Sequence, residues 1–274
     1  MRLRVFHETA YNYETPANSA IQTLRLTPRG HDGQFIVNWR IDIDRDCRLA
    51  TTTDPFGNTV HSFTVDGPLD KLIITAEGEI ETQDMSGVLR GQVERFPATV
   101  FLRETALTAS DTAIRDLAAD AAGRAGADRL ALVHLLMGEI AERMRFDSTR
   151  TDSGTSAIQA FSIGQGVCQD FAHVLIAAAR HLGIPARYVG GYLFREDGIS
   201  EQEAGHAWAE ALIDGLGWVG FDPANNVSPT DGYIRVAAGL DYLGAAPVRG
   251  TRYGGSGESL AVRVSVTQAA RPKR

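Results

Sequence analysis

The segment from Gly166 to Leu182 constrains the fold most, because its apolar residues recur with the period of one helix face. Successive members lie four, three, one, three, one and three positions apart: Val167, Phe171, Val174, Leu175, Ala178, Ala179 and Leu182. Gly183 suits the left-handed residue that ends many helices, and Pro185 prevents continuation. The sequence therefore predicts a buried amphipathic helix over 166–182.

Cys168 falls in the first turn of this predicted helix. The positive end of the helix dipole and the free N–H groups there favour a thiolate, which is the nucleophilic form of cysteine. The same N–H groups can bind the oxyanion of a tetrahedral intermediate. Cys168 is thus a candidate nucleophile, although a small buried apolar side chain is also compatible with this position.

Two further candidates, His206 and Asp222, lie on consecutive predicted strands joined by the turn residues "DGLG". An even-length connection places the two side chains on opposite faces of the sheet. A three-residue connection, with Ile213 opposite Gly217, makes Asp222 a diagonal neighbour on the face of His206, and a five-residue connection places them directly opposite. We predict an odd-length connection.

Together these residues can supply a nucleophile (Cys168), a general base (His206) and a carboxylate that orients the base (Asp222). Taken singly, His206 also fits an ordinary residue at a strand end, and Asp222 before Pro223 also fits a turn. The order of all three along the chain is what favours the catalytic interpretation.

The rest of the chain indicates an α+β fold in two parts. Residues 1–105 contain alternating strands and turn signals and predict an antiparallel sandwich or small barrel, in which His7 and His61 are ordinary sheet residues. Residues 106–274 begin with two predicted helices, the first capped by Asp111. We expect the alternating segment 258–270 to form a last strand in a sheet of this second part.

Composition restricts the class of partner. The 27 Lys and Arg residues against 34 Asp and Glu residues give a net charge of −7, so we expect no nucleic-acid or membrane partner. The first residues lack the apolar core of a secretory signal, and the longest apolar run, 174–179, is too short to span a bilayer. With Cys47 and Cys168 unpaired in sequence, we expect a cytoplasmic protein without a metal site. Composition gives no oligomeric state.

Three sequence blocks resemble the core of the bacterial transglutaminase-like superfamily, which includes proteins described as cysteine proteases. They are G-x-C-x-D at 166–170, H-A-W at 206–208 and F-D-P at 221–223, in the order and spacing of the family. The stretch "FHETAYNYETPANSAIQTLRLTPR" and "DPFGN" resemble the β-rich domain that precedes this core in many bacterial members. The resemblance extends to about residue 230.

This resemblance implies a papain-like core, with a helix bearing Cys168 packed on an antiparallel sheet bearing His206 and Asp222. It implies metal-independent and cofactor-free acyl transfer through a thioester, with a peptide or protein as substrate. Water as acceptor gives hydrolysis of a peptide, isopeptide or side-chain amide bond, which is the preferred function. An amine acceptor gives a crosslinking transglutaminase, and a non-catalytic binding module is the third alternative.

The surroundings of the triad are less constrained by the resemblance. Gln165 is a candidate oxyanion donor beside the N–H of Cys168, or a simple loop residue. Trp208 and Tyr192 are candidates for the walls of the substrate cleft. The tryptophan that animal transglutaminases place upstream of the cysteine has no counterpart between Trp39 and Cys168. Elsewhere on the cysteine helix, Asp170 and His173 are three residues apart, and we expect structural roles for both.

Overall fold

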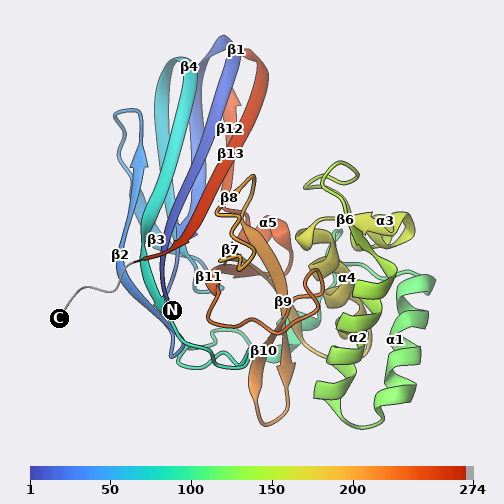
Figure 1. Cartoon of the computed structure of the whole chain (residues 1–274). Coiled ribbons are helices and arrows are strands. Elements are labelled where there is room, and N and C mark those ends of the chain that lie inside the picture. Colours follow the sequence, from blue (N-terminus) through green and yellow to red (C-terminus); the bar gives the residue numbers. More distant parts are fainter. Residues whose placement is uncertain (270–274) are drawn as a thin grey trace, which may run out of the picture.

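The computed structural model describes residues 1–269 and shows a tall strand-rich part beside a part that carries the helices (Figure 1). Within these residues, the strand-rich part is a seven-stranded antiparallel sheet with β4 and β1 at its centre. Its strands are β1 (Arg2–Thr27), β2 (Gln34–Ile43), β3 (Ala50–Thr53), β4 (Thr59–Thr82), β8 (Glu201–Gln202), β12 (Val248–Tyr253) and β13 (Ser256–Gln268).

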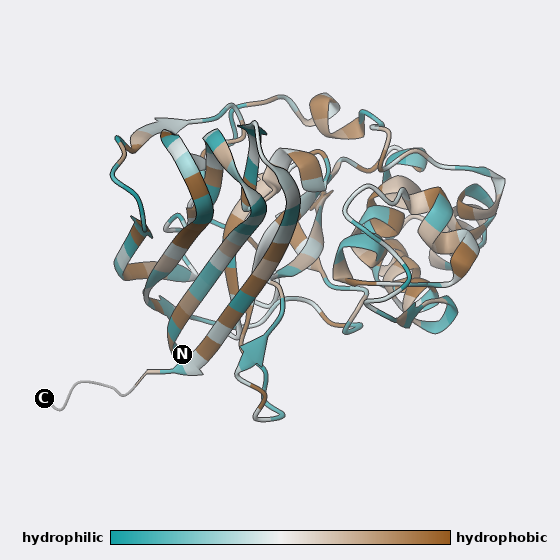
Figure 2. Cartoon of the chain, turned by 90° about the horizontal axis from the view of Figure 1, so that it is seen from above, coloured by the Kyte–Doolittle hydropathy of each residue, from teal (hydrophilic) through white to brown (hydrophobic). Residues whose placement is uncertain are grey.

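The two central strands, β1 and β4, are long enough to contribute to both layers of a sandwich. The register of β1 against β4 shifts between Asn12 and Ala17, and the two strands curve over at the top of Figure 1. One half of this ribbon is flanked by β2 and β13, and the other by β3 and β12. Tyr11 from the first half of β1 and Leu24 from the second belong to one buried cluster. Apolar and polar residues alternate along these strands (Figure 2), as the sequence predicted for a sandwich.

The predicted place of the last strand was wrong. β13 pairs with β1 from Leu3 opposite Gln268 to Thr15 opposite Ser256, so the C-terminal segment completes the N-terminal sheet. Its alternation indicated a strand with one buried face, but alternation does not select a partner 250 residues away. The last residue of the predicted strand, Ala270, lies outside the described residues. The division of the chain near residue 105 stays a prediction.

The second part is built around a four-stranded antiparallel sheet in the order β10-β9-β7-β11. The α+β prediction is confirmed. Its strands are β7 (Ala186–Leu193), β9 (His206–Ile213), β10 (Gly217–Phe221) and β11 (Tyr233–Gly239), and a short parallel pair is formed by β5 (Arg145–Phe146) and β6 (Gln165–Gly166). The helices are η1 (Ala98–Leu102), α1 (Thr112–Ala125), α2 (Arg129–Arg143), α3 (Ala157–Ile163), α4 (Cys168–His181) and α5 (Tyr242–Ala245).

The predicted cysteine helix is α4, and it begins at Cys168. One face packs on β9 and β7, and the opposite side is covered by α1, α2 and α3 (Figure 1). Every side chain from Gln169 to Arg180 is buried, so the helix is central rather than amphipathic. Its apolar stripe marked only the most hydrophobic side, because polar residues such as Asp170 and His173 are buried on the remainder. None of the helices in residues 1–269 has the length and hydropathy of a membrane crossing.

Arg180 anchors the far end of α4 in the interior, with 5% of its surface exposed. Its guanidinium donates to the carbonyls of Phe101, Ala186 and Leu240 and to the hydroxyl of Thr108. Burial lowers the pKa of Arg180 only to about 10, so the side chain stays charged at neutral pH. One side chain thereby ties α4 to η1, to the start of β7 and to the segment that follows β11.

Replacing this residue tests its anchoring role. Arg180→Leu leaves three buried carbonyls without a donor, so we expect the free energy of unfolding to fall by about 3 kcal/mol. Arg143→Leu, which removes an exposed arginine from α2, is the matched control and should leave the unfolding midpoint nearly unchanged. Urea denaturation followed by circular dichroism measures both, and equal effects of the two substitutions would contradict this role.

Candidate active site

The residues around Cys168 hold the start of α4 in one conformation. Asp170 folds back so that its Oδ2 accepts the N–H of Val167 at 2.8 Å and the hydroxyl of Thr151 at 2.7 Å. A Cβ atom at Gly166 would lie 2.5 Å from that oxygen, which only a glycine avoids. The glycine and aspartate on either side of the cysteine are therefore needed together. Both Asp170 and His173 are buried, and His173 accepts the backbone N–H of Tyr242 instead of pairing with Asp170.

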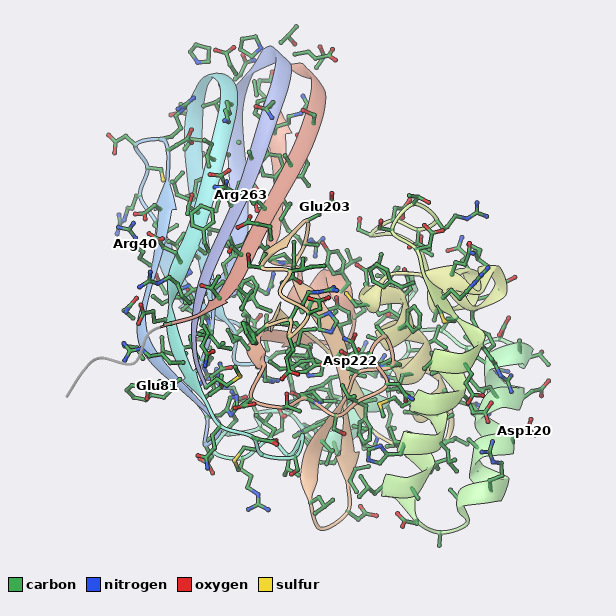
Figure 3. All side chains as sticks on the ribbon, in the orientation of Figure 1. Arg40, Glu81, Asp120, Glu203, Asp222 and Arg263 are labelled. Atoms are coloured by element: carbon green, nitrogen blue, oxygen red, sulfur yellow. The ribbon has the colours of Figure 1, made fainter. Side chains whose placement is uncertain are left out.

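The hairpin that carries the other two candidates has the predicted odd-length connection. Ile213 pairs with Gly217, which leaves three residues in the turn. β10 ends at Phe221, and Asp222 then forms an isolated bridge with Val227. In this register the Nε2 of His206 lies 2.6 Å from the Oδ2 of Asp222. Figure 3 labels Asp222 between the small sheet and the helices.

Asp222 has no exposed surface, and its carboxylate is surrounded by donors. Besides His206, its Oδ2 accepts the hydroxyl of Tyr233 and the amide of Asn225, each at 2.7 Å. Its Oδ1 accepts the backbone N–H groups of Ala224 at 3.0 Å and Asn225 at 3.3 Å. Burial raises the pKa of Asp222, but the His206, Asn225 and Tyr233 donors outweigh burial and hold that pKa below its ordinary value. The group is therefore a charged, oriented acceptor for the imidazole.

His206 is held by this carboxylate and by two aromatic rings. Trp208 stacks beside its ring at a centroid distance of 6.3 Å, and Tyr233 meets it edge-on at 5.7 Å. Burial disfavours the imidazolium, but the charges of Cys168 and Asp222 and their hydrogen bonds raise the pKa of His206 to about 10. Because its ordinary value is 6.5, the charge of His206 stabilises the fold fully below pH 6.5, and this contribution is lost as pH rises towards 10.

Cys168 and His206 open onto one cavity of about 720 Å³ between the two parts of the molecule. Tyr192 lines this cavity, as predicted, whereas Gln165 and Trp208 do not. Gln165 is held in β6, where it pairs with Arg145, and the adjacent Gln169 lines the cavity in its place. Trp208 is buried in a separate cluster with Tyr233. The role in the cleft wall expected of Trp208 was therefore wrong, and the oxyanion role of Gln165 stays a prediction.

Sequence reasoning missed the contribution of the N-terminal sheet to this cavity. His7, Thr9 and Tyr11 of β1 line it. His7 is hydrogen-bonded through Nδ1 to the hydroxyl of Tyr192 at 2.9 Å and through Nε2 to Thr9 at 3.1 Å, and burial lowers the pKa of His7 to about 4. The alternation of His7, Thr9 and Tyr11 predicted that their side chains share one face of a strand. It did not predict that this face lies against the second part of the molecule. Tyr233 was also missed, since no motif includes it.

Both cysteines are free thiols, with Cys47 outside the cavity. Within residues 1–269, no group of three or more His, Cys, Asp or Glu side chains is placed to hold a metal ion.

The charge of Asp222 can be tested through the titration of His206. We expect Asp222→Asn to move the midpoint down from about 10 by roughly 1–3 pH units, because a neutral amide no longer stabilises the imidazolium. Tyr233→Phe keeps the carboxylate and should leave His206 protonated at neutral pH. Proton NMR of the imidazole Cε1–H measures both midpoints. An unchanged midpoint in Asp222→Asn would show that the Asp222 carboxylate does not stabilise the imidazolium of His206.

Two family models match the chain. Residues 115–223 match the transglutaminase-like superfamily, and residues 3–81 match the bacterial transglutaminase-like N-terminal region. A solved structure from Cytophaga hutchinsonii, whose name proposes a cysteine protease, superposes with a TM-score of 0.78 at 20% identity, covering 100% of this chain and 92% of that one. This similarity shows the fold.

Relatives agree with these matches. An uncharacterized protein of Mycobacterium leprae is 31% identical over 290 residues, which cover 98% of this chain and 99% of the relative. A protein-glutamine gamma-glutamyltransferase of Pseudomonas aeruginosa is 33% identical over 105 residues, which cover 35% of this chain and 16% of that protein. The chain thus belongs to the transglutaminase-like superfamily and begins with the bacterial N-terminal region of that family.

Proposed function

We propose that this protein hydrolyses a peptide, isopeptide or side-chain amide bond by acyl transfer through Cys168. The observation that carries the proposal is the pair of His206 and the fully buried Asp222, 2.6 Å apart, beside a cysteine that opens a helix in the same cavity. A core role alone does not require an imidazole oriented by a carboxylate next to a free thiol.

The first half of the reaction forms a thioester. The thiol proton of Cys168 resides on His206, whose pKa of about 10 keeps it an imidazolium at neutral pH. The thiolate sulfur attacks the amide carbon, so the carbonyl oxygen becomes an oxyanion. The first N–H groups of a helix have no partner within it, and those of Cys168 and Gln169 begin α4, where they can bind that oxyanion. The carbon–nitrogen bond then breaks as the imidazolium returns its proton to the leaving amine.

The second half releases the acyl group. His206 deprotonates a water molecule, the hydroxide attacks the thioester carbon, and the carbon–sulfur bond breaks to give a carboxylic acid and the restored thiol. Throughout, Asp222 accepts the Nε2–H of His206 and thereby leaves Nδ1 to exchange the reacting proton. The carboxylate also stabilises the imidazolium each time it forms.

Transamidation is the second candidate. In that reaction a primary amine attacks the thioester in place of water and a new amide bond forms. The partial match to the Pseudomonas aeruginosa gamma-glutamyltransferase, whose name describes such a reaction, favours it. The residues of the first half-reaction are the same, so only the acceptor distinguishes the two candidates.

Alkylation by iodoacetamide tests the coupling of Cys168 to His206. At pH 6 we expect Cys168 to react about 100-fold faster than in His206→Ala, because the imidazolium no longer holds a thiolate in the variant. Cys47 is an internal reference in the same sample, since burial raises the pKa of Cys47 and no histidine base is paired with it in the described structure. Mass spectrometry quantifies both sites. Equal rates at Cys168 in the two proteins would refute the proposal.

Product analysis separates hydrolysis from transamidation. Incubation with a mixture of peptides and a primary alkylamine should yield new carboxylic acids, with no product in Cys168→Ala. The second candidate predicts peptides that carry the alkylamine instead. Identical mass spectra from the wild-type protein and Cys168→Ala would count against both reactions.

A further inference from the structure

We propose that the cavity selects an acyl substrate with a bulky apolar side chain on the residue whose carbonyl reacts, and that the N-terminal sheet supplies part of the selecting wall. The inference rests on the proposed function and specifies its substrate class. Three features of the cavity carry it: aromatic side chains near the sulfur, exposed apolar side chains at the mouth, and the absence of an unpaired cation among the described residues that line it.

Aromatic rings from different elements form the interior wall. Tyr188 of β7 and Tyr11 of β1 both line the cavity and are almost fully buried, at 3% and 9% exposure. Cys168 packs against the buried cluster that contains Tyr188. Burial, followed by the charge of Cys168, raises the pKa of Tyr188 well above its ordinary value. Tyr242 of α5 lines the same cavity and packs edge-on against Tyr188 at 6.1 Å. An apolar side chain entering beside Cys168 would exchange water for these rings.

Large, exposed apolar side chains lie around the mouth of the cavity. Phe146 of β5, Ile199 before β8 and Leu260 of β13 all line it, at 64%, 51% and 57% exposure. They come from three elements that are distant in sequence, so no single helix or strand pattern explains their convergence. Exposed apolar side chains gathered around one opening are typical of a binding surface. A bound apolar group would cover them.

The charges at the opening disfavour an acidic substrate. Glu201 and Glu203 line the cavity, and neither forms an ion pair within the described residues. Figure 3 labels Glu203 between the long strands and the helical part. The only lining arginine among those residues, Arg195, is paired with Asp197. His7 remains neutral because burial lowers its pKa to about 4. His206 is charged but is paired with Asp222. Among the described residues, a carboxylate side chain would therefore meet acidic groups and no unpaired cation.

Three polar side chains of the cavity already have partners. His7, Thr9 and Tyr192 bind one another, so they demand no polar substrate group. The volume of about 720 Å³ lies within the range of roughly 300–1,000 Å³ that small-ligand pockets occupy. An aromatic or branched aliphatic side chain fits this size and this chemistry.

Three peptide chloromethyl ketones test the selection. They are acetyl-Ala-Phe, acetyl-Ala-Gly and acetyl-Ala-Asp chloromethyl ketone, each of which alkylates a thiol as chloride leaves. We expect Cys168 to react about 30-fold faster with the Phe probe than with the Gly probe, and slowest with the Asp probe. Each rate is divided by the iodoacetamide rate of the same sample, which reports thiol reactivity without filling the cavity.

Two exposed positions provide matched variants. Leu260→Glu places a charge at the mouth and should reduce the normalised preference for Phe over Gly at least about fivefold. Ile21→Glu alters a similarly exposed apolar residue of β1 outside the cavity and should keep that preference. Because both side chains are more than half exposed, neither change requires burying a charge in the core.

The outcomes distinguish a failure of the substrate class from a failure of the proposed function. Equal normalised rates for the Phe and Gly probes, with iodoacetamide labelling still dependent on His206, would overturn the substrate class and leave the proposed function standing. Labelling independent of His206 would overturn the proposed function itself. A Phe preference that survives Leu260→Glu would refute the assignment of the selecting wall, as would an equal loss of that preference in Ile21→Glu.

Discussion

The buried carboxylate of Asp222 is the constraint on which the site depends. An ionised group without exposed surface is costly unless donors surround it, and here five hydrogen bonds do so. They come from β9, from β11 and from the loop that follows β10. These three segments must therefore reach their native positions together, because the loss of one leaves a buried charge partly unpaired.

Hydrogen bonds also join the two parts of the molecule. Asn58 beside β4 donates to the carbonyl of Ala238 at 2.7 Å and accepts its N–H at 2.8 Å. Gln34 of β2 makes the same pair of bonds with Arg235, whose side chain binds the buried Glu210. The strand-rich part is thus attached to β11 by two side-chain amides, each of which donates to and accepts from the backbone of one β11 residue. It supplies a wall of the cavity while holding the strand that carries Tyr233.

Local pattern was sufficient for the elements that carry the three candidate residues. The apolar period, Gly183 and Pro185 predicted α4, and the parity argument predicted the odd connection that allows His206 to meet Asp222. Sequence pattern did not predict contacts between segments that are distant in sequence. The alternation of β13 was recognised, but its pairing with β1 was not, because strands of either sheet can present the same alternation. Gln165 and Gln169 differ by four positions, and only the structure shows that Gln169 of α4 lines the cavity while Gln165 of β6 does not.

By itself, the sequence determined the two kinds of secondary structure, the start and end of the cysteine helix, and the order of thiol, imidazole and carboxylate along the chain. The helix and the hairpin depend on residues that are close in sequence, and the order of the three side chains is read directly from the chain. Only the tertiary structure decided that Tyr233 and Asn225 stabilise the carboxylate, that His7 and Tyr11 line the cavity, and that the last strand completes the first sheet. Those contacts join segments whose side chains give no local signal of their partners, since burial and pairing between distant segments are set by how the whole chain packs.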